Sequence, residues 1–259
     1  MNRAGASSSS PPTSRTFHVK HGPARQVADL ASSMGLEVSL DQAGHLVALV
    51  DRVLQEPQNL TAIEDVAEAV ERHLADSLAG LTIPELAGPT LVDLGSGGGF
   101  PGLVIAMVRP DIAVTLLESE RRKAEWLTRA SVDLRNVRVV ADRSESFAVR
   151  ERETHTTVTA RAVAPVVPTI ELAAPLVALG GHLVLWTSEA PADAASASAA
   201  AELVGLAAPV AHRVDPFPGA RRRILTFRKV GPTPHRFPRR PGRATSRPLI
   251  APVVPKDER

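Results

Sequence analysis

The sequence predicts an α/β fold in which a mostly parallel sheet ends in an antiparallel hairpin and follows an N-terminal helical subdomain. From Pro89 onward, short aliphatic runs alternate with stretches that suit helices. That alternation is typical of a parallel sheet with right-handed crossovers. Near the end, the runs PVAHRVDPF and RRRILTFRKV flank a Pro-Gly turn. Two strands joined so closely are expected to pair antiparallel.

Composition limits the class of protein. The chain has 259 residues, enough for one or two domains, and no cysteine. Disulfides, thiolate nucleophiles and cysteine-ligated metals are therefore excluded. No apolar run approaches the roughly 18 residues that a membrane span needs, and the N-terminus lacks the apolar segment of a signal peptide. We expect a cytoplasmic protein that does not enter a membrane.

Four regions are expected along the chain. Residues 1–23 are rich in Ser and Pro and predict a disordered tail, and residues 231–259 predict an irregular basic tail rich in Pro and Arg. Between them we expect a helical subdomain over residues 24–88 and the sheet domain over residues 89–230.

Two amphipathic segments support the helical subdomain. The first is LVALVDRVL, and the second is DVAEAVERHLADSLAGL, in which apolar residues recur at helical spacing. Thr61 and Glu64, three residues apart, predict a capping box at the start of the second helix.

Charge is distributed unevenly. From Arg213 to Arg259 the chain carries 13 Lys/Arg against 3 Asp/Glu, whereas the first 212 residues carry 17 against 25. A basic end on an acidic body favours a polyanionic partner. A solvated tail that only keeps the protein in solution is the alternative that charge alone leaves open.

A glycine-rich stretch, LVDLGSGGGFPG, begins at residue 91 and follows the first expected strand. Such turns approach a nucleotide closely. Two registers compete: Gly95, Gly97 and Gly99 form G-x-G-x-G, whereas Gly97, Gly99 and Gly102 satisfy the dinucleotide fingerprint G-x-G-x-x-G. Asp93 favours the first register because it ends the strand two residues before Gly95.

Acidic residues at the ends of the next strands extend this site. Glu118 ends AVTLLE, 23 residues after Gly95, where a carboxylate can accept hydrogen bonds from ribose hydroxyls. Asp142 and Glu145 follow VRVVA, where a polar loop would lie beside an adenine ring. These residues indicate an adenosine-containing ligand, and they leave NAD and S-adenosylmethionine both open. The histidines show no metal-like spacing, so no metal is expected.

Several motifs in the same order resemble the RsmG (GidB) family. They are NLTAIEDVAEAVERHLADSLAGL, LVDLGSGGGFPGLVIAMVRP, LLESERRKAEWL, ADRSESF and TARAVAP, and the tail TPHRFPRRPGRATSRPL is similar to the basic end of many members. The resemblance implies a Rossmann-like class I methyltransferase fold. It also implies transfer of a methyl group from S-adenosylmethionine to N7 of one guanine in 16S ribosomal RNA of the small ribosomal subunit. We expect a monomer.

The resemblance also assigns roles to residues. The expected donor-binding residues are Gly95, Ser96, Gly97, Gly99, Phe100, Glu118, Ser144, Glu145 and Arg161. Arg161 is the expected catalytic group, because it can orient donor or substrate by charge-assisted hydrogen bonds. The expected substrate-side residues from the family motifs are Asn59, Thr61 and His73, with Asp76 in the family's H-x-x-D. Arg221, Arg222 and Arg223 are expected on the same side because of their positive charge.

The sequence departs from the family pattern at two places. The family's Leu-Lys-Gly is Trp186-Thr187-Ser188 here, and its Arg-Ala-Phe is Arg161-Ala162-Val163. Two alternatives therefore stay open. One is a catalytically weak relative that binds S-adenosylmethionine and ribosomal RNA as an assembly factor, and the other is a methyltransferase with a different substrate.

Overall fold

A computed structural model describes residues 22–58, 60–187, 194–217, 219–220 and 222–249. Its centre is a seven-stranded sheet with strand order β3-β2-β1-β4-β5-β7-β6. The strands are β1 (Thr90–Leu94), β2 (Ala113–Glu118), β3 (Val137–Ala141), β4 (His155–Arg161), β5 (Val177–Thr187), β6 (Val210–Val214) and β7 (Arg222–Arg228). Strands β1 to β5 are parallel, whereas β7 pairs antiparallel with both β5 and β6. The predicted parallel sheet with an antiparallel terminal hairpin is confirmed.

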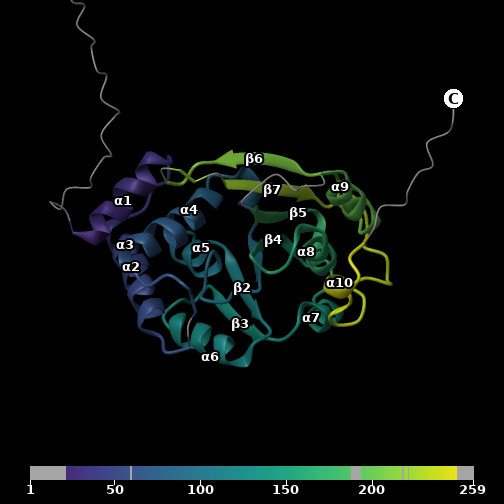
Figure 1. The fold of residues 1–259 in the computed structure, drawn as a ribbon, viewed down its shortest axis with the longest axis horizontal. Coiled ribbons are helices and arrows are strands. Elements are labelled where there is room, and N and C mark those ends of the chain that lie inside the picture. Colours follow the sequence, from purple (N-terminus) through teal and green to yellow (C-terminus); the bar gives the residue numbers. More distant parts are fainter. Residues whose placement is uncertain (1–21, 59, 188–193, 218, 221, 250–259) are drawn as a thin grey trace, which may run out of the picture.

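Helices cover both faces of the sheet (Figure 1). One face packs against α1 (Pro23–Ser33), α2 (Leu40–Gln55), α5 (Gly102–Val108) and α6 (Arg121–Ala130). The other face packs against α7 (Ser144–Arg150), α8 (Val166–Ala173) and α9 (Ala194–Leu203). The N-terminal helices share one apolar core with the sheet, and none of the helices in the described part of the chain is long and apolar enough to cross a membrane.

The second expected N-terminal helix is interrupted. It consists of α3 (Val66–Ala69), a π-helical stretch η1 (Val70–Ala75) and α4 (Asp76–Gly80). The predicted capping box is wrong: the N-cap is Asp65, whose carboxylate accepts a hydrogen bond from the Glu68 amide at 2.8 Å. π-helical stretches inside α-helices occur frequently at functional sites, and this one carries His73 in a cavity wall.

The C-terminal segment lies against the sheet domain. Residues 231–249, expected as a basic tail, include the short helix α10 (Arg243–Ser246), which contacts α8. Thr233, Phe237 and Ala244 of this segment are buried. The described part of the expected tail is therefore a packed element of the fold, which the sequence did not predict.

Candidate functional site

The glycine loop connects β1 to α5 in a conformation that requires glycine. Gly95, Gly97 and Gly99 have φ angles of 69°, 53° and 99°, in the left-handed region where a side chain is strained. Gly102 is confined differently, because a Cβ there would meet Leu116 and the Asp93 carboxylate at 2.4 and 2.6 Å. The loop thus uses the register that starts at Gly95.

Asp93 fixes both ends of the loop. Its side chain is buried, and its two oxygens accept hydrogen bonds from the Gly102 amide at 3.1 Å and the Thr159 hydroxyl at 2.8 Å. Burial raises the pKa of the Asp93 carboxyl to about 6, although these hydrogen bonds act in the opposite direction. The carboxyl ties β1 to the start of α5 and to β4.

Glu118 ends β2 beside the loop. One carboxylate oxygen accepts a hydrogen bond from the Gly97 amide at 2.9 Å, and the other accepts from the Glu120 amide at 2.8 Å. A carboxylate offers about four acceptor sites. Glu118 therefore holds the loop and still has capacity for the two hydroxyl groups of a ribose.

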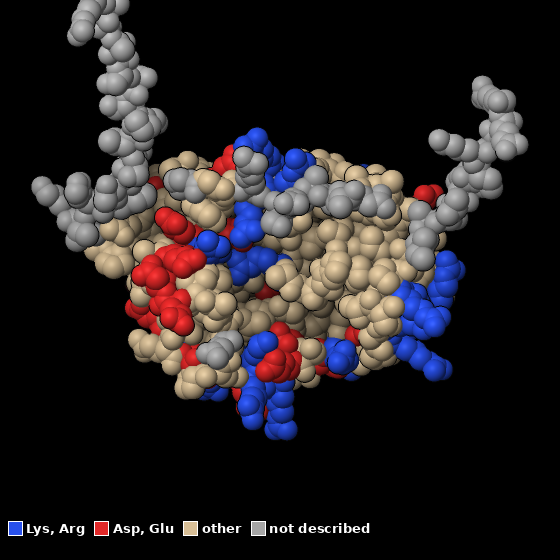
Figure 2. Space-filling model, in the orientation of Figure 1, with Lys and Arg blue, Asp and Glu red and all other residues tan. Residues whose placement is uncertain are grey.

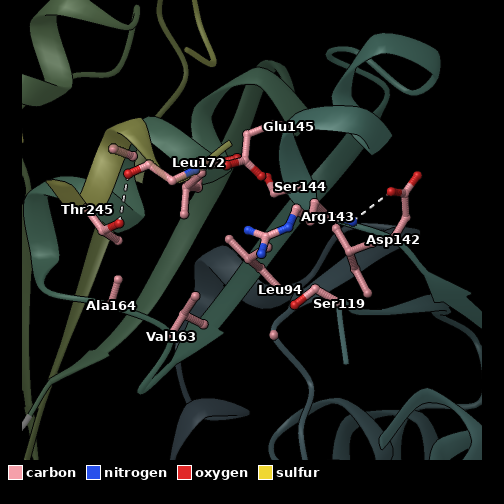
Figure 3. A pocket seen from close by; sticks show the side chains of 14 residues that line it. Leu94, Ser119, Asp142, Arg143, Ser144, Glu145, Val163, Ala164, Leu172 and Thr245 are labelled. Atoms are coloured by element: carbon pink, nitrogen blue, oxygen red, sulfur yellow. Dashed lines mark hydrogen bonds between the residues drawn. The ribbon is translucent and has the colours of Figure 1, made fainter. Parts of the chain in front are cut away.

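A cavity of about 190 Å³ opens at the carboxyl ends of β1 to β4, which is where α/β sheets bind ligands. We call it the donor cavity (Figure 3). Three of the expected donor residues, Gly95, Ser144 and Glu145, line it. The Ser144 hydroxyl donates to the Leu172 carbonyl at 2.6 Å, which joins α7 to α8 at the cavity wall.

A second, larger cavity of about 480 Å³ lies on the other side of the β4 carboxyl end. We call it the cationic cavity because Arg72, Arg161 and Arg222 line it. Ala164 lines both cavities. Ala162, between them in the chain, has φ 56°, a strained conformation for a residue with a side chain. Such strain concentrates at functional sites.

Charge in the cationic cavity is organised around Asp76. This buried carboxylate pairs with Arg161 at 3.1 Å and with Arg222 at 3.3 Å. Burial lowers the pKa of the Arg161 guanidinium, and the Asp76 carboxylate opposes that shift. Two guanidinium groups against one carboxylate leave this cluster with an excess of positive charge.

Arg161 also contacts an aromatic pair. The rings of His73 and Phe100 are stacked with centroids 4.6 Å apart, and the Arg161 guanidinium lies 5.7 Å from the Phe100 centroid. Burial and the charge of Arg161 lower the pKa of His73 to about 4, so its imidazole is neutral at neutral pH. Arg161 donates to Nδ1 of His73 at 3.4 Å, which leaves the proton on Nε2, 2.8 Å from the Thr61 hydroxyl.

Seven expected site residues line neither cavity: Thr61, Ser96, Gly97, Gly99, Phe100, Glu118 and Arg223. Ser96 is buried with its hydroxyl donating to the Asp93 carbonyl at 2.8 Å, and Phe100 packs under His73. Arg222 and Arg223 lie within β7, and of the two only Arg222 lines a cavity. Asn59 and Arg221 fall outside the described residues.

Two further features complete the site: one wall of the donor cavity that the sequence did not predict, and a packed tryptophan. Gly242, Ala244 and Thr245 line the donor cavity from the C-terminal segment, and no local pattern marks them. Trp186 is buried, and its indole donates to the Asp76 carbonyl at 2.9 Å. It supports the cationic cavity as a packed side chain. Among the described residues, no cluster of His, Asp and Glu could hold a metal ion.

These features together define the class of the protein. The strand order, the glycine loop after β1 and the acid that ends β2 are those of a class I Rossmann-like methyltransferase. A solved S-adenosylmethionine-dependent O-methyltransferase from Thermotoga maritima has the same fold, with a TM-score of 0.50, 14% identity and 71% of each chain covered. S-adenosylmethionine is the methyl donor of this class.

Sequence comparison then identifies the family. Residues 41–212 match the family model described as "rRNA small subunit methyltransferase G" (GidB). The chain is 32% identical to ribosomal RNA small subunit methyltransferase G of Thermotoga neapolitana, which covers 86% of this chain and 98% of that protein. It is 36% identical to the protein of the same name from Deinococcus radiodurans, over 85% of this chain and 90% of the relative. The chain belongs to this family, as its motifs indicated.

Proposed function

We propose that this protein transfers the methyl group of S-adenosylmethionine to N7 of a guanine in 16S ribosomal RNA. The observation that carries the proposal is the pair of cavities that meet at the carboxyl end of β4. One is bordered by the glycine loop, and the other is cationic. Membership of the family supports the ribosomal substrate, and the resemblance of the motifs supports N7.

The residues that line the donor cavity, and Glu118 between two of them in the chain, fit an adenosine-containing donor. Glu118 has acceptor capacity for ribose hydroxyls, and Gly95 lets the backbone approach closely. Ser144 and Glu145 line the side of the cavity that follows β3. When bound, S-adenosylmethionine supplies a sulfonium-activated methyl group, and the role of these residues is to hold it at the boundary of the two cavities.

The cationic cavity fits a reaction that needs orientation more than proton transfer. Guanine N7 is an acceptor with no proton, so methylation there requires no general base. His73 is neutral, and both of its ring nitrogens have partners, while Asp76 is shared by two arginines. Orientation alone can contribute about 7–11 kcal/mol. Arg161, at the boundary, would position the guanine and its phosphate by charge-assisted hydrogen bonds.

The surface around the site fits a polyanion. Figure 2 shows acidic side chains over the N-terminal helices and basic side chains over the C-terminal segment, with a hollowed region between them. Exposed arginines of that segment include Arg236, Arg240 and Arg243. Because binding to phosphates releases counterions, affinity for the RNA should fall steeply with salt.

Departures from the family motifs leave a second candidate function. Thr187, at the position of the family's lysine, lines the cationic cavity, and Val163 lines the donor cavity. A protein that binds the donor and the RNA but transfers slowly, acting in subunit assembly, is the alternative that Thr187 motivates.

Methyl transfer to purified ribosomal particles tests the proposal. Small subunits that lack the modification, protein-free 16S RNA and large subunits are each incubated with the protein and labelled S-adenosylmethionine. We expect label in small subunits or their RNA, none in large subunits, and a strong loss with Arg161→Ala but not with Arg25→Ala on the exposed face of α1. If the protein binds S-adenosylmethionine and the particles but transfers no label, while a control enzyme labels the same particles, the assembly factor is favoured.

We also propose that the protein acts as a monomer in the cytoplasm, where bacterial ribosomal subunits are found. Sedimentation at increasing protein concentration tests the first part. A mass that stays at one chain supports it, and a mass that rises to two chains contradicts it.

A further inference from the structure

The donor cavity has a wall that comes from the far end of the chain. Gly242, Ala244 and Thr245 line it next to Ser144 and Glu145, although about 100 residues separate the two groups in sequence. Figure 3 shows Thr245, on the α10 segment, and Glu145 and Leu172 bordering the same space. The Gly242 amide donates to the Glu145 carboxylate at 3.2 Å, which joins the two walls directly.

A buried ion pair holds this wall in place. Glu171 on α8 is fully buried, and its carboxylate accepts hydrogen bonds from Nε, Nη2 and the backbone amide of Arg239, of which the Nε contact is 2.7 Å. Arg239 also donates to the Arg247 carbonyl at 2.8 Å, beyond the C-terminal end of α10. The pair thereby fixes both sides of the turn that borders the cavity. The next residue of α8, Leu172, is itself part of the cavity wall.

Further contacts hold the chain before Arg239. Arg152 donates to the carbonyls of Thr233, Pro234 and Phe237. The buried Lys229 ammonium donates to the Ala174 carbonyl and the Thr233 hydroxyl and pairs with Glu153. An uncompensated buried charge is costly, so these contacts require the segment to follow this course.

We propose that residues 239–247 are a binding element for the methyl donor, which closes the donor cavity beside Glu145, and that Arg239 is the residue that positions it. The inference rests on the proposed donor site and extends it to a part of the chain expected to contact only RNA. Part of the basic C-terminus then contributes to donor affinity in the absence of any RNA.

Calorimetric titration with S-adenosylhomocysteine tests the role of Arg239 without turnover. Arg239→Ala should raise the dissociation constant at least about tenfold, because the substitution leaves Glu171 buried without a partner and releases residues 242–245 from the cavity. Arg236→Ala is the matched control: this arginine is in the same segment, is exposed, and lies over the Phe237 ring. Arg236→Ala should bind S-adenosylhomocysteine with a dissociation constant within about twofold of that of the unmodified protein.

A second measurement does not depend on breaking the ion pair. The chain contains no cysteine, so Thr245→Cys and Ser32→Cys each introduce a single thiol, the first in the donor cavity and the second on exposed α1. Saturating S-adenosylhomocysteine should slow modification of the Thr245→Cys thiol at least about fivefold and leave the Ser32→Cys thiol unchanged.

The outcomes distinguish a wrong donor site from a wrong assignment of residues 239–247. If the unmodified protein does not bind S-adenosylhomocysteine, the proposed donor site is wrong. If it binds, while folded Arg239→Ala binds equally well or the Thr245→Cys thiol reacts at the same rate with and without ligand, only the inference about the C-terminal wall is overturned. Weakened binding by Arg239→Ala together with thiol protection supports it.

Discussion

Asp93 gives a prediction whose sign and size follow from its surroundings. Burial raises the pKa of this carboxyl to about 6 from its ordinary value of 3.8. A carboxyl group with a raised pKa in the folded state favours folding when protonated, and that contribution is lost as the pH rises through the folded-state pKa. The full shift corresponds to about 3 kcal/mol, of which about 2.4 kcal/mol is lost between pH 4 and pH 7.

Asp93→Asn removes the titration and can keep the hydrogen bonds. The amide oxygen can accept from the Gly102 amide, as the carboxylate does, and the amide nitrogen can donate to the Thr159 hydroxyl. That hydroxyl can in turn donate to the Val92 carbonyl, 3.4 Å away. The free energy of unfolding of Asp93→Asn relative to the unmodified protein should therefore rise by about 2.4 kcal/mol from pH 4 to pH 7.

Urea unfolding at a series of pH values measures this difference. Asp111→Asn serves as the control, because the neighbouring Arg109 lowers the pKa of the exposed Asp111 carboxyl. Its difference from the unmodified protein should have the opposite sign and fall at lower pH: relative stability is lost as the pH rises toward about 4 and stays nearly level from pH 4 to pH 7. If the free energies of unfolding of Asp93→Asn and the unmodified protein change with pH in parallel, the raised pKa of the buried Asp93 carboxyl is refuted.

Three further predictions concern the cationic cavity and its support. A Cβ at Gly80 would lie 2.0 Å from the Trp186 ring, so Gly80→Ala should destabilise the protein by about 1–3 kcal/mol in thermal or urea unfolding. Gly44→Ala in α2, where a Cβ meets nothing within 4 Å, should instead be stabilising by up to about 1 kcal/mol; equal effects would contradict this packing. In Asp93→Asn, which lacks the carboxyl with a pKa of about 6, methyl transfer should show no inflection between about pH 5.5 and pH 8.5, because the pKa of His73 is about 4 and N7 has no proton to lose; a step near pH 6.5 in this variant would implicate His73 as a base. Arg161→Lys should lower the transfer rate about 10–100-fold and change donor affinity less than about twofold, because an ammonium cannot reproduce the forked contacts of a guanidinium; a rate close to that of the unmodified protein would remove Arg161 from its proposed role.

The sheet and the loop were predictable because their signals are local. Strand and helix periods alternate along the chain, and a short Pro-Gly link forces an antiparallel pair. The choice of the Gly95 register also follows from local spacing, since Asp93 ends β1 two residues earlier. The family motifs predicted the same fold because they occur in these positions.

The N-terminal half of the site was harder to predict. Thr61 and Glu64 satisfy the spacing of a capping box, but Asp65 is an equally good cap and lies next to the first helical turn. The Thr61 hydroxyl instead accepts from the Ile63 amide and meets His73. Propensity does not indicate a π-helical stretch, because the stretch depends on tertiary packing.

The wall made by residues 242–245 could not be predicted from its own sequence. Its position is set by Arg239 reaching a buried glutamate 68 residues earlier, and a basic, Pro-rich stretch is typical of a solvated tail. Charge patterning identifies a segment rich in arginine, but only the contacts of each guanidinium show which of them are exposed and which are part of the fold.

The most direct test of the central claim is the identity of the methylated atom. Small subunits labelled by the protein from S-adenosylmethionine are digested to nucleosides, and the products are separated and weighed by mass spectrometry. The proposal predicts that the label is recovered as 7-methylguanosine from 16S RNA, at no more than about one methyl group per subunit, because one oriented base enters the cationic cavity. Label on another base or another guanine atom, or no label from a protein that binds donor and particle, would contradict it.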